Sequence, residues 1–237
     1  MRSLYSILFI SLFLAYSLAG IAQPYEKGGK INGKITLTPI KESGLSYYPY
    51  ERVLLRAGAL KMYAKSNGYD RKYAFIINMG MRSNTKRFFI VNLKSMCVES
   101  SGLVAHGKGD GLKFNGGRQY SNDEGSNCTA LGKYKIGSSY QGFFGLAFKL
   151  DGLEASNSNA MDRNIVLHSM HCIPESPGDK PICVSEGCPA VSDQFLLQIQ
   201  DIIEESKKPI LLLIYDSTVP GSSIPFSTTS KPAGIKR

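Results

Sequence analysis

Residues 73–93 read YAFIINMGMRSNTKRFFIVNL, and this stretch decides the fold class. Its two ends, Tyr73–Met79 and Arg87–Leu93, are runs of β-branched and aromatic residues, which are typical of strands. The segment between them, Arg82-Ser83-Asn84-Thr85, consists of residues that favour turns. The stretch therefore predicts two strands joined by a turn.

Outward from this stretch, the same signals predict further strands at 97–106, 143–150, 164–169 and Ile210–Tyr215, the last an apolar run typical of a buried central strand. Apolar side chains three and four residues apart predict a helix over 51–67 that stops at Gly68. A second helix is predicted to begin at the cap Ser192 and to end before Pro209. We expect a mainly β fold with two or more α-helices.

The N-terminus has the pattern of a signal peptide. Met1-Arg2 is a short basic start, Leu4–Ala19 is apolar and uncharged, and small residues precede a cleavage site after Ala22. We expect residues 1–22 to be removed and the protein to be exported to the periplasm or cell envelope. The alternative, a retained anchor, is disfavoured because the run is short for a membrane span, and no later run reaches that length.

Three further regions follow from composition. Residues 23–71 are predicted to be an N-terminal arm with one helix, 72–216 the main domain, and 217–237 a disordered tail rich in Ser, Thr, Pro and Gly. With 43% hydrophobic and 20% charged residues the chain is globular in composition. Its net charge of +9 falls to +8 without Arg2. The cations are scattered and the protein is expected outside the cytoplasm, so we expect no nucleic-acid partner.

The five cysteines are an odd number, which is informative in an exported chain. Cys97, Cys128, Cys172 and Cys183 could form two bridges in any of three pairings, leaving Cys188 over. A leftover thiol in an oxidising compartment either pairs between chains or is reactive.

Cys188 and His168 are the residues best suited to covalent chemistry. His168 ends the apolar run Asn164–Leu167, and Cys188 lies twenty residues later. A thiol becomes a nucleophile when a neighbouring imidazole accepts its proton. Gly187 permits a tight turn, and the N–H groups of Gly187 and Cys188 could face a developing oxyanion, a contact worth about 3–4 kcal/mol of barrier.

Two competing interpretations concern these residues. Cys188 could be a buried or bridged structural cysteine. A zinc site is disfavoured because His168 and His171 would point to opposite faces of a strand and no CxxC pair is present, so we expect no metal and no cofactor.

The glycine-rich segment from Gly107 to Gly111 lacks the spacing of a phosphate-binding loop. We expect it to be a surface loop over a cleft.

At this point the sequence resembles the murein L,D-transpeptidase catalytic-domain family, of the YkuD type. The resemblance is carried, within residues 72–216, by Val104–Gly109, Ser121-Asn122, Gly125-Ser126, Leu131-Gly132, Leu150–Glu154, Arg163–Ser169, and Ser185 with Gly187–Val191. It implies a β-sandwich or barrel-like fold and a peptidoglycan stem peptide as substrate. It also implies that Cys188 forms a thioester, that His168 is base and then acid, and that Ser169 orients the imidazole through its carbonyl.

The resemblance leaves several points open. It implies that His106 lies near the cleft, as a substrate-binding or a core residue, and that a carbapenem acylates Cys188. Glu186, where the family often has another residue, would raise the pKa of the thiol unless it points away. A bridge between Cys172 and Cys183 would stiffen the cleft. The acceptor could be an amine or, in an L,D-carboxypeptidase, water.

Two other functions remain as alternatives. A sortase-like enzyme would need an Arg soon after the cysteine, and the next one is Arg237. An inactive wall-binding module on the same fold is compatible with Glu186 and the extra cysteines. The sequence does not indicate an oligomeric state.

Overall fold

The computed structural model describes residues 49–110 and 118–219. The expected signal peptide, the first part of the expected arm and most of the expected tail lie outside these residues. Their boundaries therefore stay predictions.

The described chain alternates between short strands and a few helices. In order these are α1 (Pro49–Asn67), β1 (Tyr73–Asn78), β2 (Phe88–Asn92), β3 (Cys97–Gly102), β4 (Gly132–Gly142), β5 (Gly145–Gly152), the short 3-10 helix η2 (Ala155–Asn157), β6 (Val166–Ser169), β7 (Ala190–Val191), α2 (Asp193–Glu205) and β8 (Leu211–Tyr215). The predicted class, mainly β with helices, is confirmed.

All the strands belong to one mixed sheet of eight, in the order β3-β2-β1-β8-β4-β5-β6-β7. The last strand in sequence, β8, pairs in parallel with β1 and antiparallel with β4, and so lies inside the sheet. Its five residues are all buried, as the apolar run Ile210–Tyr215 predicted. At the far edge, β6 and the two-residue strand β7 pair in parallel.

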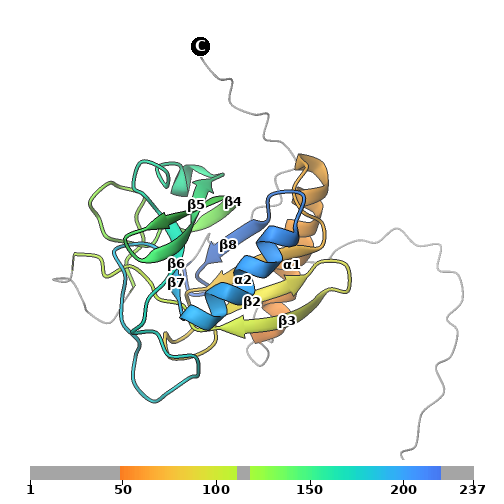
Figure 1. Cartoon of the computed structure of the whole chain (residues 1–237). Helices are drawn as coiled ribbons and strands as arrows, with labels where there is room; N and C mark the ends of the chain where they lie inside the picture. Colours follow the sequence, from red (N-terminus) through yellow and green to blue (C-terminus); the bar gives the residue numbers. More distant parts are fainter. Residues whose placement is uncertain (1–48, 111–117, 220–237) are drawn as a thin grey trace, which may run out of the picture. The chain divides into compact units, whose positions relative to one another are not determined.

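The two helices cover opposite faces of the sheet because successive strand residues point to opposite sides. Ala74 and Ile76 of β1 pack with the buried residues of α1, Val53, Ala57, Leu60 and Ala64. Phe75 and Ile77 face the other way and pack with Phe195, Leu196 and Ile199 of α2. In Figure 1, α2 crosses in front of the strands and α1 lies behind them.

Two details differ from the expected elements. Strand β4 was not predicted, because only Tyr134 and Ile136 alternate inward and the strand then runs into an exposed hairpin.

Ser192 does begin α2, but its hydroxyl makes no capping bond and donates instead to Glu175 at 2.6 Å. The other oxygen of Glu175 accepts the backbone N–H of Gln194 at 3.1 Å. A carboxylate from a preceding loop thus satisfies a donor at the start of the helix.

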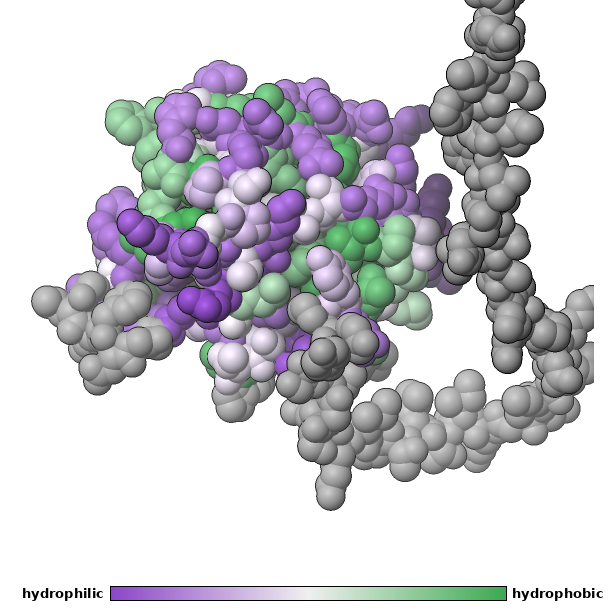
Figure 2. Space-filling view, turned by 90° about the horizontal axis from the view of Figure 1, so that it is seen from below, coloured by the Kyte–Doolittle hydropathy of each residue, from purple (hydrophilic) through white to green (hydrophobic). Residues whose placement is uncertain are grey.

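The surface is mixed in polarity. On the face seen in Figure 2, hydrophilic residues separate smaller hydrophobic patches. Within the described ranges, no helix has both the length and the apolar character that a bilayer crossing needs.

Candidate active site

The turn that carries Cys188 leads directly into β7 and is fixed by Ser185. The Ser185 hydroxyl donates to the carbonyl of Cys188 at 2.6 Å and lies 3.3 Å from the N–H of Gly187. The Ser185 backbone bonds to a neighbouring segment, accepting from the N–H of Lys108 and donating to the carbonyl of His106. Ser185 therefore holds the nucleophile's turn in place, a role that its position in the motif alone did not reveal.

Gly187 adopts a backbone conformation that only glycine accommodates well. Its φ is +117°, and a Cβ built there would lie 2.9 Å from the carbonyl oxygen of Cys128. Any side chain would thus be both strained and in contact with backbone. The Gly187 N–H, predicted to face an oxyanion, has the Ser185 hydroxyl as its partner in this structure.

The Cys188 thiol is unbridged and partly buried against the main core. The N–H of Val166 donates to Sγ at 3.4 Å, and the thiol donates to the carbonyl of Asn164 at 3.7 Å. Burial raises the pKa of Cys188. The Val166 N–H and the charge of Arg163 act in the opposite direction without cancelling the effect. The resting thiol is therefore protonated at neutral pH.

His168 is 3% exposed and its ring is held on two sides. Its Nδ1 lies 2.9 Å from the carbonyl oxygen of Ser169, and Phe144 stacks on the ring with centroids 4.7 Å apart. A carbonyl only accepts hydrogen bonds, so Nδ1 carries the proton and the lone pair of Nε2 is free to act as a base. Burial lowers the pKa of His168, although the Ser169 carbonyl partly opposes this.

The two predicted catalytic residues lie on neighbouring segments at the β6–β7 edge of the sheet. His168 pairs with Ala190, two residues after Cys188, and the thiol contacts Val166, two residues before His168. Within the described residues no hydrogen bond joins the thiol to the imidazole. The resting pair is thus two neutral groups, one on β6 and one in the turn before β7, with the S–H directed to Asn164.

Arg163 is a site residue to which the sequence gave no role. Its guanidinium donates to the carbonyls of Ser121 at 2.9 Å and Cys128 at 2.7 Å, and to the Ser126 hydroxyl at 3.2 Å. Its charge favours the thiolate of Cys188. Its position just before the strand that contains His168 was the available signal, but the loop that it binds is about 40 residues away in sequence.

His106 lies beside the nucleophile's turn but is turned toward a buried guanidinium. Its Nδ1 is 3.1 Å from Nη2 of Arg87, which is fully buried and also donates to the carbonyl of Val104. Burial, with Arg87 and Arg118 nearby, lowers the pKa of His106 to about 4. The imidazole of His106 is neutral at pH 7. The backbone carbonyl of His106 accepts the N–H of Ser185 and helps to fix that residue.

Glu186 points away from the thiol and pairs with Lys108 at 2.5 Å. Both side chains are largely exposed, so the pair contributes little to stability. Of the influences on the pKa of Cys188, that of Glu186 is the smallest. The expected disturbance by this carboxylate is therefore minor.

The cysteines form one bridge, and the two-bridge expectation is wrong. Cys172 and Cys183 are joined, closing the loop between His168 and Cys188, whereas Cys97 and Cys128 are free. Cys97 begins the edge strand β3, and Cys128 is buried next to the nucleophile's turn. Cys97 therefore lies in the sheet, whereas Cys128 lies in the loop before β4.

A mainly β domain with a buried histidine on one strand and an unbridged cysteine in the turn before the neighbouring strand defines a class of candidate cysteine acyltransferases. Residues 49–215 match the model of the L,D-transpeptidase catalytic domain, YkuD_2, and the chain belongs to this family. The family is one of peptidoglycan-modifying enzymes. The match runs from α1 to β8 and so includes the helix as well as the sheet.

Comparison with other proteins gives more distant likenesses. A search of the curated proteins finds no match. The helical cell shape determining protein Pgp2 from Campylobacter jejuni is 14% identical, with 62% of this chain and 49% of that chain covered and a TM-score of 0.40. The K307A mutant of Pgp2 is 15% identical, with 62% of this chain and 48% of that chain covered and a TM-score of 0.40. The chain thus spans about half the length of Pgp2.

A fused Zn-dependent amidase/peptidase/peptidoglycan-binding domain-containing protein from Clostridium acetobutylicum ATCC 824 is also similar. It is 14% identical, with 71% of this chain and 63% of that chain covered and a TM-score of 0.32.

Proposed function

We propose that the chain is an L,D-transpeptidase that acts on peptidoglycan stem peptides through a thioester on Cys188. The observation that carries the proposal is the unbridged Cys188 thiol at the β6–β7 edge, next to the strand of a histidine whose Nδ1 is committed to a carbonyl. A free thiol and an available Nε2 are the two groups that acyl transfer requires.

In the first half-reaction the S–H turns from Asn164 and gives its proton to Nε2 of His168. The sulfur then attacks the carbonyl carbon at the L-centre of the third stem residue. The carbon–nitrogen bond to the terminal D-Ala breaks, and the leaving amine takes the proton from Nε2. This yields a thioester on Cys188 and free D-Ala, with no net change in protons.

In the second half-reaction an amine of a neighbouring stem attacks the thioester and gives a proton to Nε2. The carbon–sulfur bond breaks, and the sulfur recovers that proton as a thiol. Water in place of the amine gives a shortened stem, which is the L,D-carboxypeptidase alternative. In both cases an oxyanion forms, and the Gly187 N–H would have to exchange its Ser185 partner to stabilise it.

The proposal is tested with purified muropeptides and analysis of the products by mass spectrometry. We expect release of D-Ala and a crosslinked product, both absent for Cys188→Ala with an unchanged circular dichroism spectrum. Shortened monomers alone would identify the carboxypeptidase. Undiminished turnover by Cys188→Ala would overturn the proposal.

A carbapenem separates the enzyme from an inactive wall-binding module on the same fold. We expect the intact protein to gain the mass of one carbapenem at Cys188, and the Cys188→Ala variant to gain none. A folded protein that binds peptidoglycan and stays unmodified would favour the module.

We also propose that the protein works outside the cytoplasm, in the periplasm or cell envelope. The support is the N-terminal apolar segment in the sequence and the Cys172–Cys183 bridge, because disulfides persist in oxidising compartments. N-terminal sequencing of protein recovered from the envelope is expected to begin at Gln23. A chain that still begins at Met1 would favour a retained anchor.

A further inference from the structure

A basic pocket of about 500 Å³ lies at the C-terminal end of α2, away from the nucleophile. Its walls come from the turn after α1, the start of β1, the turn between β2 and β3, and the segment that joins α2 to β8. The 13 residues of α2 span ~20 Å, which separates this end from the end that follows Cys188 and β7. The pocket is therefore a different place from the proposed active site.

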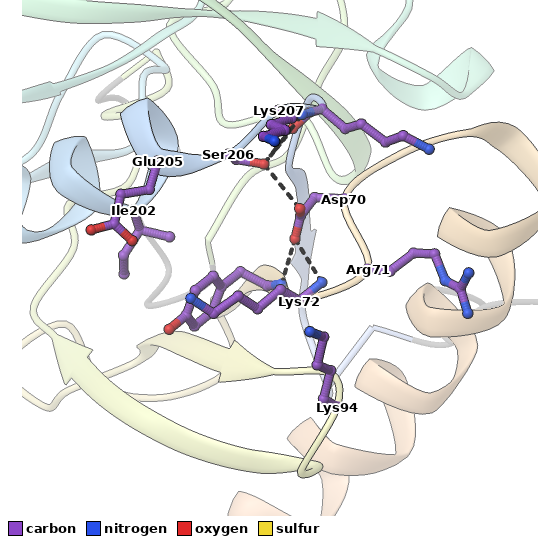
Figure 3. Close-up of a pocket in the computed structure, with 10 residues that line it drawn as sticks. Asp70, Arg71, Lys72, Lys94, Ile202, Glu205, Ser206 and Lys207 are labelled. Atoms are coloured by element: carbon purple, nitrogen blue, oxygen red, sulfur yellow. Dashed lines mark hydrogen bonds between the residues drawn. The ribbon is translucent and has the colours of Figure 1, made fainter.

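The lining is dominated by cations. Five basic residues, all exposed, face two acidic ones, Asp70 and Glu205; the basic residues are Arg71, Lys72, Lys94, Lys207 and Lys208. Among the described residues, none of these five takes part in a salt bridge. Figure 3 shows the side chains of Arg71 and Lys207 extending outward from Asp70, so the cations surround the pocket, and their combined charge attracts an anion.

Asp70 and Glu205 offset only two of the five positive charges, and the carboxylate of Asp70 is already bonded to the protein itself. One oxygen accepts the backbone N–H groups of Lys72 at 2.7 Å and Tyr73 at 2.6 Å, and the other accepts the Ser206 hydroxyl at 2.9 Å. Figure 3 shows Asp70 in the middle of the pocket, joined to Ser206 on one side and to the Lys72 backbone on the other. Asp70 thus fixes the two walls that carry the cations.

The remaining lining is suited to the body of a ligand larger than an ion. The side chain of Ile202 and the ring of Tyr73 supply apolar surface among the charges, and the Lys72 ammonium lies 4.8 Å from the centroid of that ring. The volume lies in the range of small-molecule sites. Lysine ammonium groups act as point charges on phosphate, and an arginine fork can bind it with two parallel hydrogen bonds.

We propose that this pocket binds a phosphorylated saccharide, with its phosphates on the lysines and its sugar against Tyr73 and Ile202. Two sources carry this chemistry: a free sugar phosphate and the phosphorylated sugar of a glycolipid. The site is independent of the chemistry at Cys188, so it stands or falls separately from the proposed function.

The test is calorimetric titration of the full chain at low salt with glucose 1,6-bisphosphate, and with citrate as a tricarboxylate of comparable charge. We expect the bisphosphate to bind and citrate to bind more weakly. In Lys207→Ala/Lys208→Ala the affinity is expected to fall about tenfold, since two charge contacts are lost. Lys94→Glu, on the opposite wall, is expected to give a similar loss.

The matched control is Lys61→Ala/Lys149→Ala, which removes the same charge from exposed positions outside the pocket. Its affinity is expected to change by less than about twofold, because screening weakens distant charges. Equal binding of citrate and bisphosphate, or an equal loss in the control, would show attraction to net charge alone and overturn the proposal.

A vesicle arm distinguishes the two sources. Phosphatidylcholine vesicles are compared with the same vesicles carrying a bisphosphorylated glucosamine lipid. Binding of the lipid vesicles without binding of the soluble bisphosphate assigns the site to a glycolipid, and the reverse assigns it to a free sugar phosphate. Binding of neither overturns the proposal, and muropeptide turnover is expected to be unchanged in Lys207→Ala/Lys208→Ala.

Discussion

The sheet has two halves that are stabilised in different ways. The helix-covered half, strands β1 to β3 with α1 and α2, is held by apolar contacts: five of the six β1 residues are buried, and Phe88 meets Phe195 edge to face at 5.3 Å. The site half, strands β4 to β7 with their loops, shares the apolar core through residues such as Phe148, Leu150 and Leu167, but its loops are fixed by polar side chains that bond to backbone. Arg163 and Ser185 are examples.

The difference indicates that stability and the positions of the site atoms depend on different kinds of contact. Non-directional burial gives stability that tolerates small shifts. Hydrogen bonds with defined geometry fix particular atoms, and acyl transfer needs the sulfur, the imidazole and the oxyanion donors in defined positions. We therefore expect substitutions in the helix-covered half to change unfolding and those in the site half to change turnover.

The largest expected effect is on turnover in the site half. His168→Ala removes the base and later acid, so kcat is expected to fall about 10²–10⁴-fold while the fold is retained. The measurement is steady-state release of D-Ala, with the melting temperature recorded in parallel. The control is His171→Ala, an exposed histidine paired with Asp193, which is expected to keep its activity. Equal losses in the two variants would contradict the role of His168.

The next effect is on stability in the helix-covered half. Ile76 is fully buried between the sheet and α1, so Ile76→Ala is expected to cost about 2–5 kcal/mol in the free energy of unfolding. Urea unfolding measures it, and Leu55→Ala, at a side chain that is 65% exposed on α1, is expected to change it by less than about 0.5 kcal/mol. A large loss of turnover in folded Ile76→Ala would contradict the expectation that substitutions in the helix-covered half change unfolding and not turnover.

A smaller effect tests the backbone of the nucleophile's turn. Gly187→Ala places a methyl group on a residue with positive φ and 2.9 Å from the Cys128 carbonyl oxygen. Gly125→Ala also requires a positive φ, but no atom lies within 4 Å of the added methyl group. We expect about 1–3 kcal/mol from the backbone strain in each. A further loss of stability, together with reduced turnover, is expected at Gly187 alone. Unfolding curves of equal midpoint would refute the close approach.

The smallest effect concerns the pH dependence of the thiol. The pKa of Cys188 is raised and that of His168 is lowered, so both are neutral at pH 7, and the thiolate fraction grows only as pH rises toward the raised pKa. In a Cys97→Ser background, alkylation by iodoacetamide is expected to accelerate steadily above pH 7. A plateau below pH 7 would instead indicate a resting ion pair.

Glu186 gives a fine test of the same electrostatics. Its charge raises the pKa of Cys188, so Glu186→Gln is expected to move the alkylation curve slightly to lower pH. Lys108→Met removes the partner of Glu186 and serves as the comparison. A shift to higher pH in Glu186→Gln would contradict the assigned sign.

Much of the helix-covered half was predictable because periodicity reports burial. The apolar spacing in 51–67 corresponds to α1, and the runs near 73–79, 87–93 and 210–215 correspond to β1, β2 and β8. The predicted strand 97–106 ends earlier, at Gly102, where Phe195 occupies the space that a Cβ would need. These elements meet the core with regular side-chain patterns, which a sequence displays.

The site half was predictable only in its chemistry. His168 and Cys188 stood out as residue types, and the spacing suggested a family. Strand β7 has two residues and no periodicity, and the exposed end of β4 has no apolar pattern. The contacts of Arg163 with the 121–128 loop depend on a fold that brings distant segments together.

The position of β8 in the sheet affects when the domain can fold during synthesis. β8 lies between β1 and β4, so the two halves are joined through residues 211–215 and, beyond β3, by the bridge of Val104 to Val191. A chain that is still being made, and lacks β8, leaves the facing edges of β1 and β4 open. The sheet can therefore close only after residues 211–215 have been synthesised.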